Sequence, residues 1–592
     1  LSTAENNLLE NGFYAKTFED ELPCSGLEIL VPVLAEDVTD KVNNAVKPEM
    51  SAEEAQKVRN TAIATLEKES SDKTKLRCEV TILYQGGAYW LYGYKVYNDV
   101  RLVWAPEQTI AAFGGDPDNY EYPRYCVDCS LFRAYENGKP AKIEHFLKWS
   151  KNGVKEGELV FVSGFPGRTE RSYTREHLEF QRDVYFPWRL QKLFRREVVY
   201  SAFANRSLEN QRRIADDLGG VQNYRKRAIG QLQGLQTPVL WKNVPQTQPK
   251  KDSPEEKIKN AISEARDNSQ SRVYDLVELG EAFNSQTFRI ARTLVRLAYE
   301  SEKPNKDRLK DYRDGNLESL KKTLFADTPI YEDVEMVKLT DSLTMLYEFL
   351  QQDWNDLAFI FDTDLSPKEL ATELVLDSKV RDIAERKRLA EGGVKAIEKS
   401  VDPMIRFALR LESAAKKFRE NYENKVEAPI TSAYAELAKR RFEQLGTSVY
   451  PDATFTLRLS FGVVKGYKED DGTEAAPTTN IAGMFKRAEQ QKFKEPFDPP
   501  QSWKDGKSKL NPNTAFNLVT TNDIIGGNSG SPLINTKGEV VGLVFDGNIY
   551  SLSNNFVYTE TQSRCVSVHA DVIVEALRKI YGADRIADEL GK

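Results

Sequence analysis

The chain has 592 residues, of which 40% are hydrophobic and 29% charged, and its formal net charge is −7. This length exceeds what one hydrophobic core supports, so we expect two or three domains. The small negative charge, with no basic block in the sequence, argues against a nucleic-acid partner. No run of about 18 apolar residues occurs, so we expect no membrane span. The chain begins at Leu1 without a charged and apolar leader, so we expect that any targeting signal was removed or not included.

Residues 1–175 are predicted to consist mainly of strands and turns. Short runs rich in β-branched and aromatic residues alternate with clusters of glycine and asparagine, as antiparallel hairpins require. One helix is expected between Ser51 and Leu66. The strands predicted in this part lie at residues 27–33, 78–84, 89–97, 100–104, 127–135 and 158–162.

Residues 176–445 are predicted to be helical. Ser253-Pro254-Glu255-Glu256 is a capping box with proline at the first helical position, and Ser366-Pro367-Lys368-Glu369 repeats it. Asp402-Pro403 begins a third helix in a similar way. Behind these starts, apolar residues recur at helical spacing and charges cover the other faces. This pattern favours a solvated helical domain with its own core over a coiled-coil surface for a partner.

Residues 446–592 are predicted to return to strands. These strands lie at residues 453–459, 516–519, 532–534 and 539–545, and an amphipathic helix follows from Asp571 to Tyr581. The predicted fold class is therefore α+β, with a β part at each end and a long helical insert. Each β part has about the size of one small barrel.

The stretch from Thr520 to Asn535 carries the strongest chemical signal. Its centre, Gly527-Asn528-Ser529-Gly530, has the glycines that let a serine nucleophile sit on a tight turn and a substrate carbonyl come close. In this interpretation Ser529 is the nucleophile, and the backbone N–H groups of Gly527 and Ser529 form the oxyanion hole. The alternative is a plain glycine-rich hairpin loop. The strands predicted on both sides favour the catalytic interpretation.

A serine nucleophile needs a base, usually a histidine that a carboxylate orients. Asp128 is the best candidate for the acid, since it is predicted as a buried acid at the start of an apolar strand; a turn residue at a strand edge is the alternative. Two-barrel serine peptidases place their triad in the order His, Asp, Ser. None of the three histidines, His145, His177 and His569, precedes Asp128, and the first two are predicted to be surface residues. The base is therefore missing from this chain, or the layout is unusual.

The five cysteines do not form a predicted disulfide framework, because their number is odd and they are sparse. Cys126 and Cys129 have CxxC spacing, which can indicate redox or metal chemistry. They lack a second pair, and residues three apart in a strand point to opposite faces. We expect a structural role for them, and no cofactor or metal for the chain.

Further motifs add a specific resemblance. The matching stretches include Phe113-Gly114-Gly115-Asp116-Pro117-Asp118-Asn119 and the block Thr521-Asn522-Asp523-Ile524-Ile525-Gly526-Gly527-Asn528-Ser529-Gly530-Ser531-Pro532. Others lie at residues 123–124, 128–133, 164–169, 223–226 and 545–548, so the matches span nearly the whole chain. With these motifs the chain resembles the dipeptidyl peptidase 7 / dipeptidyl peptidase 11 family of bacterial serine exopeptidases, closer to the dipeptidyl peptidase 7 branch.

The resemblance implies a chymotrypsin-like double β-barrel with a large helical domain over the cleft. The implied domains are residues 1–175 (N-terminal barrel part, incomplete at its start), 176–445 (helical cap) and 446–592 (C-terminal barrel with the nucleophile). The family releases dipeptides from the free amino end of peptides, acts as a homodimer and is exported to the periplasm or cell surface. Its catalytic histidine lies in a Thr-Asn-His-His-Cys segment that would fall shortly before Leu1. We therefore expect the chain of 592 residues alone to be inactive or nearly so.

The resemblance also assigns roles to residues. Ser529 matches the nucleophile and Asp128 the triad acid, while Asn119, Asn223 and Asp546 match the groups that hold the substrate's amino end. Where the family has Trp-x-Trp, this chain has Tyr120-Glu121-Tyr122, which changes the stacking surfaces there. The residues at the family's substrate-binding positions are Asn119, Tyr120, Arg124, Asn223, Asp546 and Gly547.

Two residues make opposite predictions about the side chain next to the cleaved bond. Asp523 lies six residues before Ser529, the spacing of the acid that selects Lys or Arg in trypsin-like enzymes. This acid recurs in family members of different specificity, so we expect a structural role for it. Members selective for Asp and Glu carry an arginine at the position of Gly547, where it can pair with a carboxylate. Glycine there predicts a preference for apolar or aromatic side chains.

Two other functions remain open from the sequence. One is a non-catalytic peptide-binding protein on the same scaffold, since no histidine precedes Asp128. The other is an endopeptidase of the trypsin type. Peptide substrates with a free amino end are the expected ligands, without nucleic acid or a membrane span.

Overall fold

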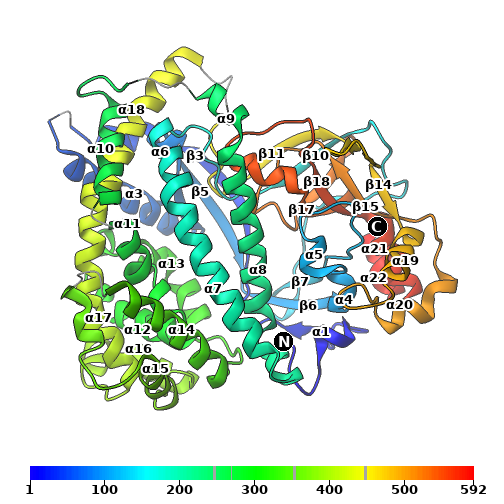
Figure 1. Cartoon of the computed structure of the whole chain (residues 1–592), viewed down its shortest axis with the longest axis horizontal. Coiled ribbons are helices and arrows are strands. Elements are labelled where there is room, and N and C mark those ends of the chain that lie inside the picture. The colour runs from blue at the N-terminus through cyan, green and yellow to red at the C-terminus, as the bar shows by residue number, and fades with distance from the viewer. Residues whose placement is uncertain (48, 245–247, 268–269, 351–354, 446–449, 592) are drawn as a thin grey trace.

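The protein divides into a helical side and a sheet side, with helices α7 (Phe186–Ala204) and α8 (Leu208–Gln236) between them (Figure 1). The structure is a computed structural model, and it describes residues 1–592 except 48, 245–247, 268–269, 351–354, 446–449 and 592. It confirms the coarse prediction of a mixed helix-and-sheet protein. The predicted boundary at residues 445/446 falls at the edge of residues 446–449, which lie outside the described part.

The largest sheet has eight strands and carries the Ser529 region. Its order is β11-β10-β16-β17-β18-β15-β14, and β9 pairs with β17. A bridge between Val464 and Thr520 links the segment after β11 to the end of β15, so the sheet curls back on itself. The strands are β9 (Lys148–Trp149), β10 (Leu159–Gly164), β11 (Arg458–Val463), β14 (Thr478–Asn480), β15 (Ala515–Thr520), β16 (Pro532–Asn535), β17 (Glu539–Gly547) and β18 (Cys565–His569).

A second sheet packs against helices of the C-terminal part around one core. Trp104, Phe113 and Val127 from the first part are buried together with Phe516 and Ile573 from the last part. The five strands are β1 (Phe13–Tyr14), β2 (Leu22–Pro23), β6 (Asp99–Ala105), β7 (Leu131–Glu136) and β8 (Lys139–Pro140). The helices next to this core are α19 (Ile481–Gln490), α20 (Gln501–Gly506), α21 (Ala570–Lys579) and α22 (Asp584–Leu590).

A third sheet of three strands lies against the helical side. It consists of β3 (Ile29–Asp37), β5 (Ala88–Tyr97) and β4 (Arg77–Leu83) in that order, with α3 (Ala52–Thr74) packed on it. Arg77 pairs with Glu28 at 2.8 Å and donates to Ser319 at 2.8 Å, which ties this sheet to a helix of the insert. Strands predicted in the first β part therefore contact both sides of the molecule. The predicted domain limits at 175/176 stay a prediction.

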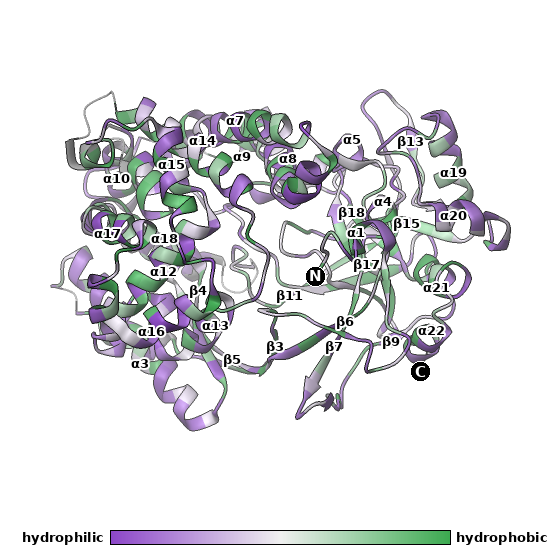
Figure 2. Cartoon of the chain, turned by 90° about the horizontal axis from the view of Figure 1, so that it is seen from below, coloured by the Kyte–Doolittle hydropathy of each residue, from purple (hydrophilic) through white to green (hydrophobic). Residues whose placement is uncertain are grey.

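The helical side has its own buried core, in which Phe288, Ala291, Val295 and Ala298 pack as their spacing predicts. Figure 2 shows hydrophilic and hydrophobic residues alternating along these helices, as amphipathic helices require. The longer helices are α10 (Pro254–Asp267), α12 (Gln286–Ser301), α13 (Asp314–Leu324), α14 (Glu332–Leu350), α15 (Pro367–Leu376), α16 (Ile383–Glu398), α17 (Pro403–Tyr422) and α18 (Ala428–Leu445).

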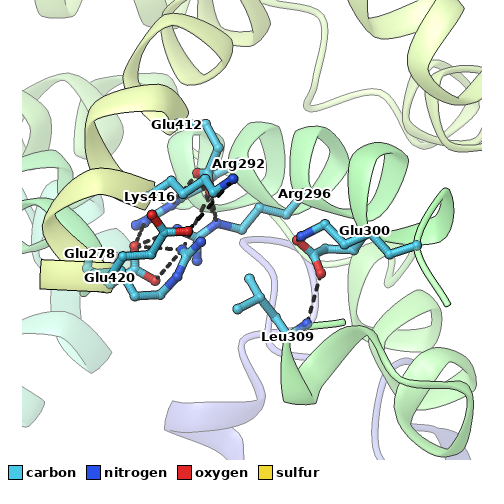
Figure 3. A network of polar contacts seen from close by, with 10 residues as sticks. Glu278, Arg292, Arg296, Glu300, Leu309, Glu412, Lys416 and Glu420 are labelled. Carbon is cyan, nitrogen blue, oxygen red and sulfur yellow. Dashed lines mark hydrogen bonds and ion pairs between the residues drawn. The ribbon is translucent and has the colours of Figure 1, made fainter. Parts of the chain in front are cut away.

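A buried ion-pair network joins three elements of the helical side (Figure 3). The carboxylate of Glu278 accepts hydrogen bonds from Arg292, Arg296 and Arg419 at 2.9, 2.7 and 3.2 Å. Glu412 accepts from Arg296 at 2.9 Å. Only 8% of the Glu278 side chain is exposed, so removing its charge would leave buried cations without a partner.

Most predicted elements are confirmed, and one strand is wrong. The caps predicted at Ser253, Ser366 and Asp402 each accept a backbone N–H of the following helix. The strand predicted at 453–459 begins only at Arg458. Phe455 has a positive φ of 61° and donates its N–H to the carbonyls of the 166–167 turn, so this segment is a loop that crosses to another part of the chain.

Candidate active site

The Ser529 loop connects β15 to β16 and presents the serine to solvent. Gly527 and Gly530 have φ angles of 108° and 85°, which other residues rarely adopt. A Cβ on Gly527 would lie 2.5 Å from the carbonyl oxygen of Phe165, so the loop requires glycine there. The N–H of Gly530 donates to Val544 of β17 at 2.7 Å and fixes the loop on the sheet.

Ser529 remains the predicted nucleophile, and its surroundings are compatible with that role. Ser529 is exposed, and its Oγ donates to the carbonyl of Phe545 at 3.3 Å. Within the described part of the chain, the backbone N–H groups of Gly527 and Ser529 have no hydrogen-bond partner. Free N–H groups beside a nucleophile are what an oxyanion hole needs.

Asp128 faces the same cavity, but it is not the buried strand residue that the sequence predicts. The strand begins at Leu131, and Asp128 keeps an exposed surface because it borders the cavity. The segment before it is anchored, since Asn517 of β15 exchanges two hydrogen bonds with the Cys126 backbone at 2.8 and 2.9 Å. No described residue forms a hydrogen bond with the Asp128 carboxylate. The surrounding protein raises the pKa of Asp128 to about 6 by desolvation, which Arg124 opposes and Asp546 reinforces.

Asp546 at the end of β17 is the centre of the predicted amino-end pocket. Arg124 donates to its Oδ2 at 2.6 Å, and both side chains are at least nine-tenths buried. The backbone N–H groups of Tyr120 and Gly547 also donate to this carboxylate, at 3.1 and 2.9 Å. Tyr120 has a φ of 58°, and this left-handed turn directs its N–H toward Asp546. Oδ1 accepts only the Gly547 bond among these, so it keeps capacity for another donor.

Asn119 and Asn223 meet across the boundary between the sheet side and the helical side. Asn119 follows the short helix α5 (Gly115–Asp118), and its amide nitrogen donates to Asn223 of α8 at 3.1 Å. The side-chain oxygen of Asn119 therefore remains available as an acceptor. The two asparagines lie beside Asp546 in one cavity.

Helix α8 is held over the cavity by small residues. A Cβ on Gly230 would lie 2.3 Å from Leu552, and one on Gly234 would lie 2.9 Å from Ser553. Gln231 donates to Asn555 at 2.8 Å. These contacts seat α8 on the short helix η11 (Ile549–Asn555), which itself lines the cavity.

The cavity has a volume of about 280 Å³ and joins three distant parts of the chain. It brings together all the predicted site residues except Gly527, which lies in the loop beside it. Sequence reasoning missed Arg227 and the apolar wall residues; Arg227 follows Asn223 by one helical turn, which was the available signal. The lining residues are Asn119, Tyr120, Arg124, Asp128, Asn223, Arg227, Ile524, Ile525, Gly526, Ser529, Val544, Phe545, Asp546, Gly547, Ser551, Leu552 and Asn555.

Asp523 does not line this cavity. Arg171 holds its carboxylate with two hydrogen bonds of 2.6 and 2.8 Å, and the Tyr450 hydroxyl donates to it at 3.2 Å. Arg171 also donates to the carbonyl of Asn554 at 2.6 Å. This pairing agrees with the structural role expected for Asp523.

None of the three histidines lines the cavity, and all three lie in the described part of the chain. His145 is exposed as predicted. The surface prediction for His177 is wrong: its ring stacks on Tyr173 at 3.9 Å, and burial lowers its pKa to about 3. His569 is buried at the end of β18, where its Nδ1 accepts the N–H of Asp571 at 3.1 Å.

The cysteines have no redox or metal geometry in the described residues. All five are free thiols there, and burial raises the pKa of Cys126 and Cys129, whereas a reactive cysteine needs a lowered one. Over the same residues, no group of three or more potential metal ligands occurs. No helix in the described part is long and apolar enough to cross a membrane.

Comparison with known proteins places this geometry in a family. An Asp/Glu-specific dipeptidyl-peptidase from Shewanella putrefaciens is 28% identical, over 99% of this chain and 87% of its own. A dipeptidyl-peptidase 7 from Phocaeicola vulgatus is also 28% identical, over 100% of this chain and 86% of its own. The crystal structure of Porphyromonas endodontalis DPP11 in complex with the dipeptide Arg-Glu shares the fold, with a TM-score of 0.77, 22% identity and coverage of 100% of this chain and 89% of that one. The peptidase S46 family matches residues 1–592. The predictions of the family and of a serine dipeptidyl peptidase are confirmed, and the chain belongs to the peptidase S46 family.

Proposed function

We propose that this protein is a serine dipeptidyl aminopeptidase that binds the free amino end of a peptide at Asp546 and attacks the second peptide bond with Ser529. One observation carries this proposal. A single cavity of about 280 Å³ is lined by the exposed Ser529, by Asp546, and by Asn223 and Arg227 of α8. In this proposal the substrate would place its ammonium at Asp546 and the carbonyl of its second residue at Ser529.

The amino-end pocket has the chemistry that an ammonium requires. An ammonium has three donors and no acceptor, and a charged group leaving water needs charged or strongly polar partners. The free acceptor positions are Asp546 Oδ1 and the side-chain oxygen of Asn119. Asn223 positions Asn119 through their 3.1 Å hydrogen bond, and Arg124 orients Asp546.

The catalytic steps follow from the loop. Ser529 would attack the carbonyl carbon, and the N–H groups of Gly527 and Ser529 would stabilise the oxyanion. An imidazole between Ser529 and Asp128 would accept the serine proton and return it to the leaving amine. The unpaired carboxylate of Asp128 faces the cavity, as such a partner requires.

The side chain next to the cleaved bond is proposed to be apolar or aromatic. This chain matches relatives named Asp/Glu-specific dipeptidyl-peptidase and relatives named dipeptidyl-peptidase 7. The comparisons therefore do not decide between an acidic and an apolar side chain, and the proposal is based on the residues that line the cavity. Ile524, Ile525, Val544 and Leu552 line it, and Gly547 adds no charge. Burying a leucine or phenylalanine there contributes roughly 1.5–3 kcal/mol.

The test compares Leu-Leu amide with acetyl-Leu-Leu amide by calorimetric binding and, where the chain turns over, by kcat/KM. Acetylation removes the ammonium charge and adds bulk at the proposed amino-end pocket, so we expect at least about a tenfold loss. Asp546→Asn should reduce the affinity for the free amine similarly, while Asp471→Asn, an exposed acid far along the chain, should not. Equal binding of the free and acetylated ligands would reject the proposal in favour of an endopeptidase.

The remaining expectations are proposed on the resemblance alone. They are a chymotrypsin-like double barrel, a homodimer, and a periplasmic or cell-surface location. Light scattering of the purified protein tests the dimer, since a monomeric mass at micromolar concentration would contradict it. The family match favours the enzyme over the non-catalytic peptide-binding alternative.

A further inference from the structure

A phenylalanine near the nucleophile loop has a backbone conformation and an exposure that packing does not explain. Phe455 has a φ of 61°, a value that is unusual for a bulky residue and that glycine adopts without strain. The residue is 65% exposed, so it adds little to a core. Glycine would therefore suit this position better if only the turn mattered. A strained residue that adds little packing is typical of a functional site.

The backbone of Phe455 is fixed to the turn at residues 165–168. Its N–H lies 2.9 Å from the carbonyl oxygen of Pro166 and 2.8 Å from that of Gly167. A Cβ on Gly167 would be 3.8 Å from Cδ2 of the Phe455 ring, so the ring lies beside a residue that has no side chain. These contacts hold the ring on the turn and leave most of its surface exposed.

This turn contacts the nucleophile loop directly. The N–H of Gly167 donates to the carbonyl of Gly526 at 2.8 Å, and Gly526 is three residues before Ser529. The same turn packs so closely on the next residue, Gly527, that no Cβ fits there. A single turn of backbone therefore lies between Phe455 and the loop that carries the nucleophile.

The sheet places Ser529 between this turn and the proposed amino-end pocket. In the strand order β10-β16-β17, the turn at 165–168 follows the end of β10, the loop before β16 carries Ser529, and the end of β17 carries Asp546. Strand β16 runs antiparallel to both of its neighbours, so these three segments leave the sheet at the same edge. The turn with Phe455 thus lies across the Ser529 loop from Asp546.

The direction of a bound substrate follows from this arrangement. This step rests on the proposed function, which places the ammonium at Asp546 and the carbonyl of the second residue at Ser529. An extended chain that passes these two points in that order continues away from Asp546, toward the turn with Phe455. Because such a chain advances about 3.3 Å per residue, the side chains of the third and fourth substrate residues are the ones that would meet the ring.

We propose that Phe455 binds an apolar or aromatic side chain of the leaving peptide, at the third or fourth residue of the substrate. An aromatic side chain can pack on the exposed ring edge to face or offset, and both surfaces then lose water. The preference concerns residues after the cleaved bond. It is therefore separate from the preference proposed for the second residue.

The experiment measures peptide affinity by calorimetry in a Ser529→Ala background, so that no ligand is cleaved. The ligands are Leu-Leu-Phe-Gly, Leu-Leu-Gly-Phe and Leu-Leu-Gly-Gly, all as C-terminal amides, so they have the same length and charge. We expect phenylalanine at one of the two positions to raise the affinity about tenfold over the Gly-Gly peptide. This ratio should persist when salt is added, because no ion pair carries it.

Variants assign the gain to Phe455. Phe455→Ala should bring the affinity ratio to within about twofold of one, and Phe455→Trp should retain the gain because a large aromatic surface remains. Both variants should bind Leu-Leu amide, which ends before the ring, as tightly as the Ser529→Ala parent; a purely structural role of Phe455 would change this affinity too. Phe461→Ala is the matched control and should leave the ratio unchanged, since Phe461 is a second exposed phenylalanine, six residues further along in β11.

Equal affinity for the three tetrapeptides in the Ser529→Ala protein would overturn the inference, even if Phe455→Ala does not fold. A phenylalanine preference that survives in a folded Phe455→Ala would overturn it as well, and so would a preference that only Phe461→Ala removes. Leu-Leu amide separates these outcomes from a failure of the proposed function. If it binds and its acetylated form does not, the amino-end site stands whatever Phe455 does.

Discussion

Replacing Asp523 with asparagine tests whether this carboxylate stabilises the fold or selects the side chain of the substrate. In the trypsin-like interpretation Asp523 binds a lysine or arginine of the substrate. In the structure its carboxylate is occupied by Arg171 through bonds of 2.6 and 2.8 Å and does not line the cavity. Asp523→Asn keeps the shape and removes the charge, so it tests the two interpretations directly.

The expected cost is a loss of stability. A charged hydrogen bond contributes about 1.5–3 kcal/mol, and an asparagine can still accept one of the two bonds from Arg171. The side chains of Arg171 and Asp523 are 19% and 22% exposed, so solvent weakens the pair only in part. We expect Asp523→Asn to lower the free energy of unfolding by about 2 kcal/mol.

The assay combines urea unfolding with binding of Leu-Lys amide and Leu-Leu amide. The ratio of the two affinities should stay within about twofold of the unmodified protein, since neither side chain reaches Asp523. A double-mutant cycle with Arg171→Gln should return a coupling of similar size to the stability loss. If Asp523→Asn removed a strong preference for lysine and left stability unchanged, the structural assignment would be refuted.

Three further outcomes are expected. Because desolvation raises the pKa of Asp128 to about 6, ionisation of this carboxylate costs stability, and the cost grows from about pH 4 until it is complete above about pH 6. After allowance for its exposure, Asp128→Asn should therefore add less than about 1 kcal/mol at pH 8 and nothing below about pH 4, and a destabilised variant at pH 8 would contradict this. Glu278→Gln should cost about 3–5 kcal/mol in urea unfolding, because it leaves buried arginines unpaired, whereas Glu385→Gln should cost under about 1 kcal/mol since Arg388, its partner in that pair, is mostly exposed. A Cβ at 547 would lie 2.1 Å from the hydroxyl oxygen of Ser551, so Gly547→Arg should be tolerated only together with Ser551→Gly; that double variant should bind Leu-Glu amide about tenfold better relative to Leu-Leu amide, and no gain would count against the assigned pocket.

The features predicted well from the sequence are those set by local patterns. Ser366 and Glu369 form their capping box because both partners lie within one helical turn. The Ser529 loop is similar, since glycines fix the turn whatever packs around it. Local patterns do not explain every glycine of this loop. At Gly527 the atom that leaves no room for a side chain belongs to Phe165, which is distant in the sequence.

Features that depend on distant contacts could not be predicted in this way. The sequence does not reveal that β10 pairs with β16 and β11, more than 290 residues later. The sequence also does not reveal that Arg171 forms an ion pair with Asp523, or that Asp128 borders a cavity and keeps exposed surface. In each case the decisive neighbour is set by tertiary packing.

The place of α8 beside the cavity follows from the same kind of packing and bears on the proposed function. The glycine-flanked serine loop is compatible with cutting inside a chain as well as at its end, so it cannot by itself set the length of the released fragment. In the proposed function that length would depend on α8, whose Asn223 meets Asn119 while Gly230 lets the helix approach Leu552. The helix thus brings Asn223, a predicted amino-end residue, to a cavity that Ser529 of the sheet side also lines. In the proposed function, selectivity for a free amino end would therefore need Asn223 of the helical side together with Asp546 of the sheet side, while the bond-breaking chemistry would come from the sheet side alone.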